Sequence, residues 1–122
     1  NMDFNDIIKL LDETVANLKD TMRRKSSDYT GGKTSQDPFA NFNSTNVFDV
    51  DPIIGIMIRV LDKMQRIRSF VKDDELQVPN ESVDDAFDDM IGYTILAKAL
   101  MKQRRDTDSI QKLDDPASSR KS

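Results

Sequence analysis

The chain has 122 residues, of which 33% are charged and 37% are hydrophobic, and its formal net charge is −4. This length is expected to form one domain, and the acidic balance gives no general attraction to duplex nucleic acid or to an anionic membrane. Cysteine and histidine are absent, which excludes disulfides, thiolate chemistry, histidine bases and His-ligated zinc. A bound metal would need oxygen ligands, which favours Mg²⁺, Mn²⁺ or Ca²⁺.

The first predicted helix begins near residue 4 and covers about 20 residues with one apolar face. Asp3 or Asn5 is a suitable N-cap, and the basic run Arg23–Lys25 suits the negative end of a helix. The apolar positions recur at steps of three and four residues; they are Phe4, Ile7, Ile8, Leu11, Val15, Leu18 and Met22.

A long loop is predicted from about Ser26 to Val50. Loops of this length in compact domains are usually functional or disordered. Two interpretations of its aromatic residues stay open: they anchor the loop on the core, or Tyr29 and Phe42 stack on a base while Asn41 hydrogen-bonds it. The Gly-Gly pair before Lys33 makes this lysine a weak candidate for phosphate binding, because the Walker pattern is missing.

The second predicted helix has a clear start, with Asp51 as N-cap and Pro52 at the first helical position. Residues 53–58 are apolar almost all round, so this helix is expected to be the central, buried one. Its later half carries Arg59, Asp62, Lys63 and Arg66.

Two interpretations of these charges stay open. Asp62 follows Arg59 by three positions and precedes Arg66 by four, which suits a ladder of ion pairs within the helix. Alternatively, Asp62 faces carboxylates on the last helix, and the basic residues Arg59, Lys63 and Arg66 contact phosphate oxygens.

The third predicted helix runs from about Glu81 to Arg105, with Asn80 or Ser82 as its cap. Its apolar stripe is predicted to face the core, with its centre at Val83, Ala86, Met90 and Ala97; the stripe also includes Phe87, Tyr93 or Thr94, and Met101. The apolar period fades from residue 106 onward. No segment alternates like a strand, so we predict an all-α fold: a bundle of three main helices with a long structured loop between the first and second. Residues 1–105 form a single domain whose modest core is completed by dimerisation, and residues 106–122 form a mobile tail.

The last helix opens with five carboxylates: Glu81, Asp84, Asp85, Asp88 and Asp89. The simplest interpretation is that acidic residues match the positive end of the helix dipole. However, like charges four residues apart repel by about 0.2–0.5 kcal/mol per pair, and a bound cation would remove that cost. In this interpretation Asp85 and Asp89 reach a shared site most directly, with Glu81 at its mouth.

No apolar run reaches the roughly 18 residues of a membrane-spanning helix. Nor does any segment have the form of a signal peptide. We therefore expect a cytoplasmic protein that does not contact a membrane.

Taken in order, four blocks resemble the nucleotide modification associated domain 1 family of phages and bacteria. The resemblance covers about Lys25 to Leu100. This family is similar in turn to the all-α nucleoside triphosphate pyrophosphatases of the MazG and dimeric dUTPase type. The blocks are Lys-x-x-Asp-Tyr from Lys25, Asp-Pro-Phe-x-Asn-Phe from Asp37, Arg-x-x-Asp-Lys-x-x-Arg from Arg59, and Glu-Ser-x-x-Asp-x-x-x-Asp-x-x-x-Tyr from Glu81.

The resemblance implies a helical nucleotide-binding protein, often dimeric, in which helix carboxylates hold Mg²⁺, with Mn²⁺ as an alternative. Asp85 and Asp89 would bind the metal, Asp62 would bind the metal or the attacking water, and Glu81 would bind the metal or act as a base. The pyrophosphatases carry Glu-x-x-Glu on the earlier helix, whereas here Asp62 alone is available. Weaker metal binding is therefore expected.

Three functions follow as hypotheses. The first is a Mg²⁺-dependent pyrophosphohydrolase that converts a nucleoside triphosphate to the monophosphate, which would serve a phage in the host cytoplasm by clearing a canonical deoxynucleotide. The second is a nucleotide-binding module without catalysis, and the broken earlier motif favours it. The third is an acidic helical protein that binds a host factor.

Overall fold

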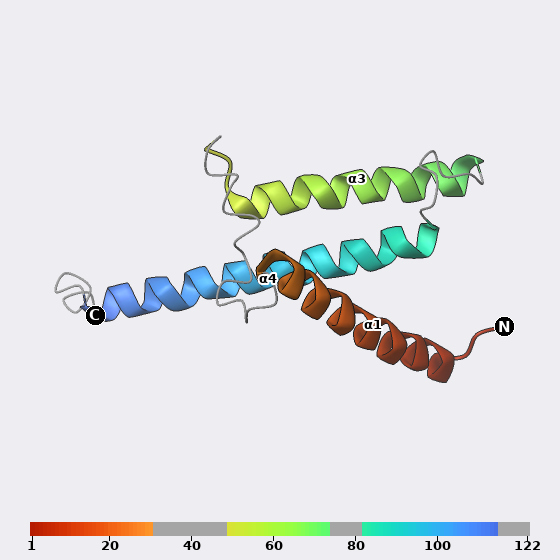
Figure 1. Ribbon diagram of the computed structural model, residues 1–122, viewed down its shortest axis with the longest axis horizontal. Coiled ribbons are helices and arrows are strands. Elements are labelled where there is room, and N and C mark those ends of the chain that lie inside the picture. The colour runs from red at the N-terminus through yellow and green to blue at the C-terminus, as the bar shows by residue number, and fades with distance from the viewer. Residues whose placement is uncertain (31–48, 74–81, 115–122) are drawn as a thin grey trace. The chain divides into compact units, whose positions relative to one another are not determined.

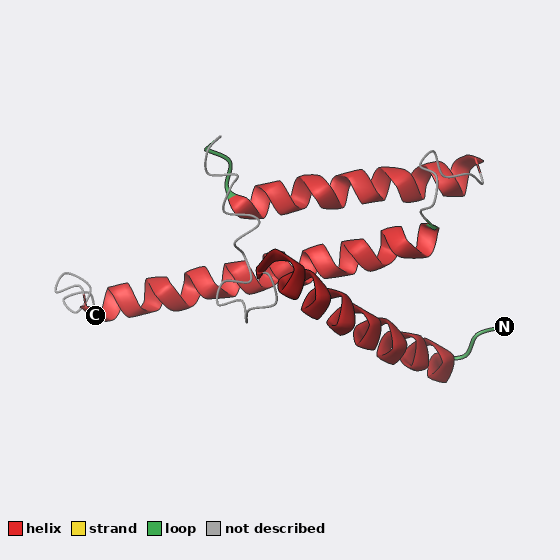
Figure 2. Ribbon diagram, in the orientation of Figure 1, coloured by secondary structure: helices red, strands yellow, loops and turns green. Residues whose placement is uncertain are grey.

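The computed structural model describes residues 1–30, 49–73 and 82–114, which form three α-helices (Figure 1): α1, Phe4–Thr30; α3, Pro52–Asp73; and α4, Val83–Asp114. Within these ranges the chain is helix and short connecting backbone without strands (Figure 2). The predicted all-α class with three main helices is therefore confirmed. The chain divides into two compact units, Asn1–Asn41 and Phe42–Ser122, and each is considered separately.

The start of α1 is fixed by a reciprocal pair of side-chain hydrogen bonds. The Asp6 amide donates to Asp3 Oδ1 at 2.9 Å, and the Asp3 amide donates to Asp6 Oδ2 at 3.0 Å. This capping box confirms Asp3 as the N-cap. The helix continues to Thr30, past the predicted end at Lys25, because residues 26–30 contain neither glycine nor proline to stop it.

The start of α3 also follows the prediction. Asp51 Oδ1 accepts a hydrogen bond from the Ile53 amide at 2.8 Å, and the Asp51 carbonyl accepts one from the Gly55 amide at 2.9 Å. Pro52 occupies the first helical position, where its missing N–H leaves nothing unsatisfied. The cap and the proline therefore set the first turn together.

The last helix, α4, is longer than predicted. It begins at Val83 and continues to Asp114, so residues 106–114 are helical and do not belong to a tail. The sequence loses its apolar period there, and Leu113 is 84% exposed, yet the first strong helix breaker is Pro116. Residues 115–122, the rest of the predicted tail, lie outside the described residues.

In the second unit α3 and α4 run antiparallel, side by side, as a helical hairpin (Figure 1). The buried residues of the hairpin are Ile56 and Val60 on α3 and Ala86, Ala97 and Leu100 on α4. None of the described helices is both long enough and apolar enough to cross a membrane.

The core face of α4 differs from the predicted one. Phe87 and Met101 were predicted to face the core, but their side chains are 48% and 45% exposed, whereas Ala86 is fully buried. The buried residues of this helix are Ala86, Ala97 and Leu100. The predicted burial of Ala86 and Ala97 is confirmed, whereas that of Phe87 and Met101 is wrong.

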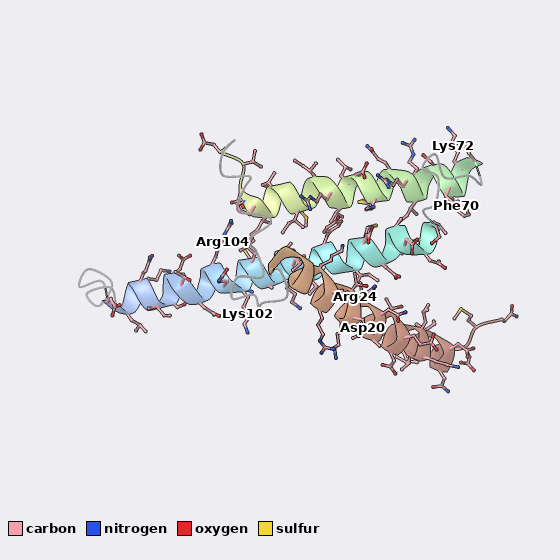
Figure 3. All side chains as sticks on the ribbon, in the orientation of Figure 1. Asp20, Arg24, Phe70, Lys72, Lys102 and Arg104 are labelled. Atoms are coloured by element: carbon pink, nitrogen blue, oxygen red, sulfur yellow. The ribbon has the colours of Figure 1, made fainter. Side chains whose placement is uncertain are left out.

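A bidentate ion pair joins the start of α3 to the later half of α4. Arg104 Nη1 and Nη2 donate to Asp51 Oδ2 and Oδ1 at 2.9 and 2.6 Å, and Figure 3 shows Arg104 on the side of α4 that faces α3, with Lys102 on the opposite side. The hydrogen bond from Arg104, followed by that from the Ile53 amide, lowers the pKa of Asp51. The same pair raises the pKa of Arg104. The N-cap of α3 is thereby tied to the later half of α4.

Candidate functional site

One side of α3 carries the basic residues that the sequence singles out. At 100° per residue, Arg59, Lys63 and Arg66 fall within about 60° of one another around the helix axis. This arc borders the face that packs on α4, where Ile56 and Val60 are buried. The three cations are therefore presented together along one edge of the hairpin, which we call the charged edge.

Lys63 forms the ion pair that joins the charged edge to α4. Its Nζ lies 2.9 Å from Asp89 Oδ2, and the lysine side chain is 13% exposed while that of Asp89 is 36% exposed. An ammonium group this far from water requires an anionic partner. The acidic start of the last helix does face the middle helix, but the contact at Asp89 is made by Lys63.

Asp62 is bonded within its own helix. Arg66 Nη2 lies 3.1 Å from Asp62 Oδ2, four residues earlier, and the Asp62 side chain is 55% exposed. The ion-pair interpretation of this segment is therefore confirmed for Asp62 and Arg66.

Tyr93 of α4 lies beside the charged edge and is not among the predicted site residues. The Arg59 guanidinium carbon lies 5.9 Å from the centre of the Tyr93 ring, within the range of a cation–π contact. A signal was present, because Tyr93 follows Asp85 and Asp89 at successive steps of four residues and so shares their stripe on α4.

Asp85 takes part in the cap of α4. Its amide donates to Ser82 Oγ at 3.1 Å, and its Oδ2 accepts from the Ser82 amide at 3.2 Å. This is a capping box with aspartate in the position usually held by glutamate. This contact gives Asp85 a structural role at the start of α4, and its role as a metal ligand stays a prediction.

The pKa of Asp88, within the acidic start of α4, is raised. Its side chain is half-buried, and burial raises its pKa, with further contributions from the charges of Asp85, Asp84 and Asp89. The neighbouring carboxylates therefore contribute to the raised pKa of Asp88, after burial.

The donor atoms present are of the kind that Mg²⁺ prefers. However, no three carboxylates of the described residues come together in a position to hold a metal ion. Asp62 forms an ion pair with Arg66, and Asp89 forms one with Lys63. Asp85 is hydrogen-bonded to Ser82. Glu81, the fourth predicted ligand, lies outside the described residues, so the Mg²⁺ site stays a prediction.

The other predicted site residues lie elsewhere. Glu81, Lys33, Asn41 and Phe42 fall outside the described residues. Tyr29 belongs to the last turns of α1, and its side chain is also outside what is described. The roles assigned to these five residues stay predictions.

The segment that carries the charged edge is similar to a known protein family. Residues 53–102 match the family model of nucleotide modification associated domain 1. The match covers α3 and the first two thirds of α4, and it contains the motif from Arg59 and the motif from Glu81. It supports the resemblance to this family over the hairpin. Neither the curated proteins nor the solved structures gave a match to the chain.

Proposed function

We propose that the hairpin of α3 and α4 binds a nucleotide by its phosphates along the charged edge. The observation that supports this most is the placement of Lys63, whose ammonium is held between the helices by Asp89 at 2.9 Å. Arg59 and Arg66 flank it within one arc of α3. Clustered lysine and arginine side chains are what recognition of a polyphosphate requires.

In this proposal, residues that precede α3 in the sequence bind the nucleoside. Tyr29 and Phe42 would stack on the base, Asn41 would hydrogen-bond its edge, and Lys33 would add a phosphate contact. These roles rest on the chemistry of the side chains, because all four residues lie outside the matched segment 53–102. We also propose that the protein is a homodimer. It would act in the cytoplasm, which is that of the host cell if a phage encodes the protein.

We further propose hydrolysis of a nucleoside triphosphate. Water attacks the α-phosphorus, the bond to the oxygen bridging the α and β phosphates breaks, and a nucleoside monophosphate and pyrophosphate are released. When bound, Mg²⁺ supplies charge neutralisation on the phosphates and lowers the pKa of water. Because the chain has no histidine or cysteine, a carboxylate must accept the proton, and Glu81 and Asp62 are the candidates. This reaction is the one that a resemblance to MazG-type and dimeric dUTPase-type pyrophosphatases would imply.

A specific observation favours a second function, nucleotide binding without catalysis. Asp62 and Asp89 are each engaged by a basic side chain, and the described residues gather no three carboxylates at one point. A protein of this kind would sequester a nucleotide or present it to a modifying enzyme.

One experiment separates the two functions. The protein is titrated calorimetrically with a panel of nucleoside triphosphates, with and without Mg²⁺, and the recovered nucleotide and released pyrophosphate are measured. Binding with pyrophosphate release that is lost in Asp62→Asn or Glu81→Gln supports the hydrolase. Binding with intact nucleotide supports the binding module, and no binding to any nucleotide overturns both.

A further inference from the structure

The apolar stripe of α1 has the spacing of a coiled-coil seam. Its positions alternate in steps of four and three residues, which is the spacing of the a and d positions of a heptad repeat. We call this stripe the α1 seam; its members are Phe4, Ile8, Leu11, Val15, Leu18 and Met22. Phe4 is 73% exposed, Leu11 54%, Ile8 41% and Val15 38%. The seam is therefore a regular and largely exposed apolar stripe along the described part of the first unit.

A helix with such a surface needs a partner. Most of the stability of a helix in a protein comes from packing its apolar face, because propensity alone leaves isolated helices marginal. Four exposed seam side chains in succession also form a continuous apolar surface of the type that marks an interaction site.

The charges of α1 indicate what kind of partner fits. Residues 1–13 carry four acidic side chains and one lysine, a side-chain charge of −3, whereas residues 14–25 carry four basic side chains and one aspartate, a charge of +3. A second copy laid antiparallel sets each acidic half against a basic half. A parallel copy would set like charges together.

We propose that the α1 seam is the interface between two copies of this chain, with the two α1 helices antiparallel. In this register Phe4 meets Met22 of the second copy, Ile8 meets Leu18, and Leu11 meets Val15. Each a position then faces a d position, and the contacts repeat about a two-fold axis. This inference rests on the homodimer of the proposed function and specifies its interface; the nucleotide site on α3 and α4 is measured separately.

Leu10 and Leu11 provide a matched pair of variants, because both are 54% exposed but Leu11 alone belongs to the seam. In sedimentation equilibrium the wild type and Leu10→Asp are expected to be dimers. Leu11→Asp should raise the dimer dissociation constant at least about tenfold, because a buried carboxylate replaces an apolar contact. A monomeric wild type, as expected if the seam is covered within one chain, would overturn the proposal, and so would a Leu11→Asp dimer of unchanged affinity.

Cysteine cross-linking tests the orientation and does not depend on the folding of a charged variant. The chain has no cysteine, so Phe4→Cys and Met22→Cys are made singly, in forms that differ in mass. Along one helix the two positions are about 27 Å apart. The antiparallel interface predicts that oxidation of a mixture yields the mixed dimer and that neither variant cross-links with itself. Self-linked dimers of both variants, or no cross-link at all, contradict this interface.

Nucleotide calorimetry on the same samples keeps the two proposals apart. A Leu11→Asp monomer with unchanged nucleotide affinity leaves the proposed nucleotide site intact and supports the α1 interface. A wild type that dimerises as described but binds no nucleotide overturns the proposed function and leaves the interface standing.

Discussion

Lys63 and Asp89 form an ion pair across the hairpin, with Nζ 2.9 Å from Oδ2 and the lysine side chain 13% exposed. The pair has two consequences. It holds an ammonium group at the charged edge in one position, and it occupies the carboxylate of Asp89. A ligand phosphate at this edge would therefore meet a cation whose position is already set, which lowers the cost of ordering it.

Replacing Lys63 should weaken nucleotide binding. A hydrogen bond to a charged group contributes about 1.5–3 kcal/mol, so Lys63→Met should raise the dissociation constant on the order of 10- to 100-fold in calorimetry. Lys63→Arg should retain part of the affinity because the charge remains.

Lys72 of α3 is the matched control. It is exposed, and Figure 3 shows it on the side of α3 that points away from α4, opposite Phe70. Lys72→Met removes the same charge and should leave the affinity within about twofold, since distant exposed charges are screened by salt. Equal losses for the two variants would mean that binding depends on general charge and not on the charged edge.

Ser82 should contribute to stability as the N-cap of α4. Its Oγ accepts a hydrogen bond from the Asp85 amide nitrogen at 3.1 Å. Loss of such a cap costs about 1 kcal/mol of stability. Ser82→Ala should therefore lower the free energy of unfolding by about that amount in urea titrations, whereas Ser82→Asp, which restores an acceptor, should show little change. If Ser82→Ala has the same free energy of unfolding as wild type, the capping box does not contribute to stability. Asp85 would then be available for another role.

Local signals explain which parts of the fold were predictable from the sequence. Asp51 followed by Pro52 fixed the start of α3, because a cap and a proline act within one turn. The ends of α1 and α4 were placed too early, at Lys25 and Arg105, because fading periodicity does not stop a helix in the absence of glycine or proline.

The contacts of the charged edge were less predictable. The sequence predicts that the middle helix lies beside the acidic helix. Whether Asp62 or Lys63 faces Asp89 depends on the rotation of α3 about its axis. Neighbouring residues point in directions about 100° apart, and apolar periodicity does not fix the rotation well enough to choose between them. The same argument applies to α4, where Ala86 and Phe87 are neighbours: Ala86 is buried and Phe87 is 48% exposed.

Asp88 should make stability depend on pH. Its pKa is raised above the ordinary 3.8 by burial and by neighbouring carboxylates. The folded state therefore holds this proton more tightly than the unfolded chain, and the resulting stabilisation is present below pH 3.8 and lost as pH rises through the raised value. Asp88→Asn cannot ionise and should be more stable than wild type at pH 7 by about 0.5 kcal/mol, given the repulsion removed.

The measurement is urea unfolding of both proteins at pH 7 and at pH 3, where the advantage of Asp88→Asn should disappear. The exposed Asp106 of α4 supplies the control, since Asp106→Asn should show no such difference between the two pH values. A constant advantage at both pH values would mean that the substitution acts by something other than the charge of Asp88.

Ile56 should be the most sensitive apolar position of α3. It is fully buried against α4, whereas Ile54 on the same helix is 54% exposed. Removing buried methyl groups costs the lost transfer energy and the cavity left behind, so Ile56→Val should lower the free energy of unfolding by about 1 kcal/mol and Ile56→Ala by about 3 kcal/mol. Ile54→Ala should cost less than about 1 kcal/mol in the same urea titrations. Similar losses at the two positions would show that α3 does not pack on α4 by the face containing Ile56, and the placement of Lys63 beside Asp89 would fail with it, because both side chains of α3 depend on the same rotation of the helix.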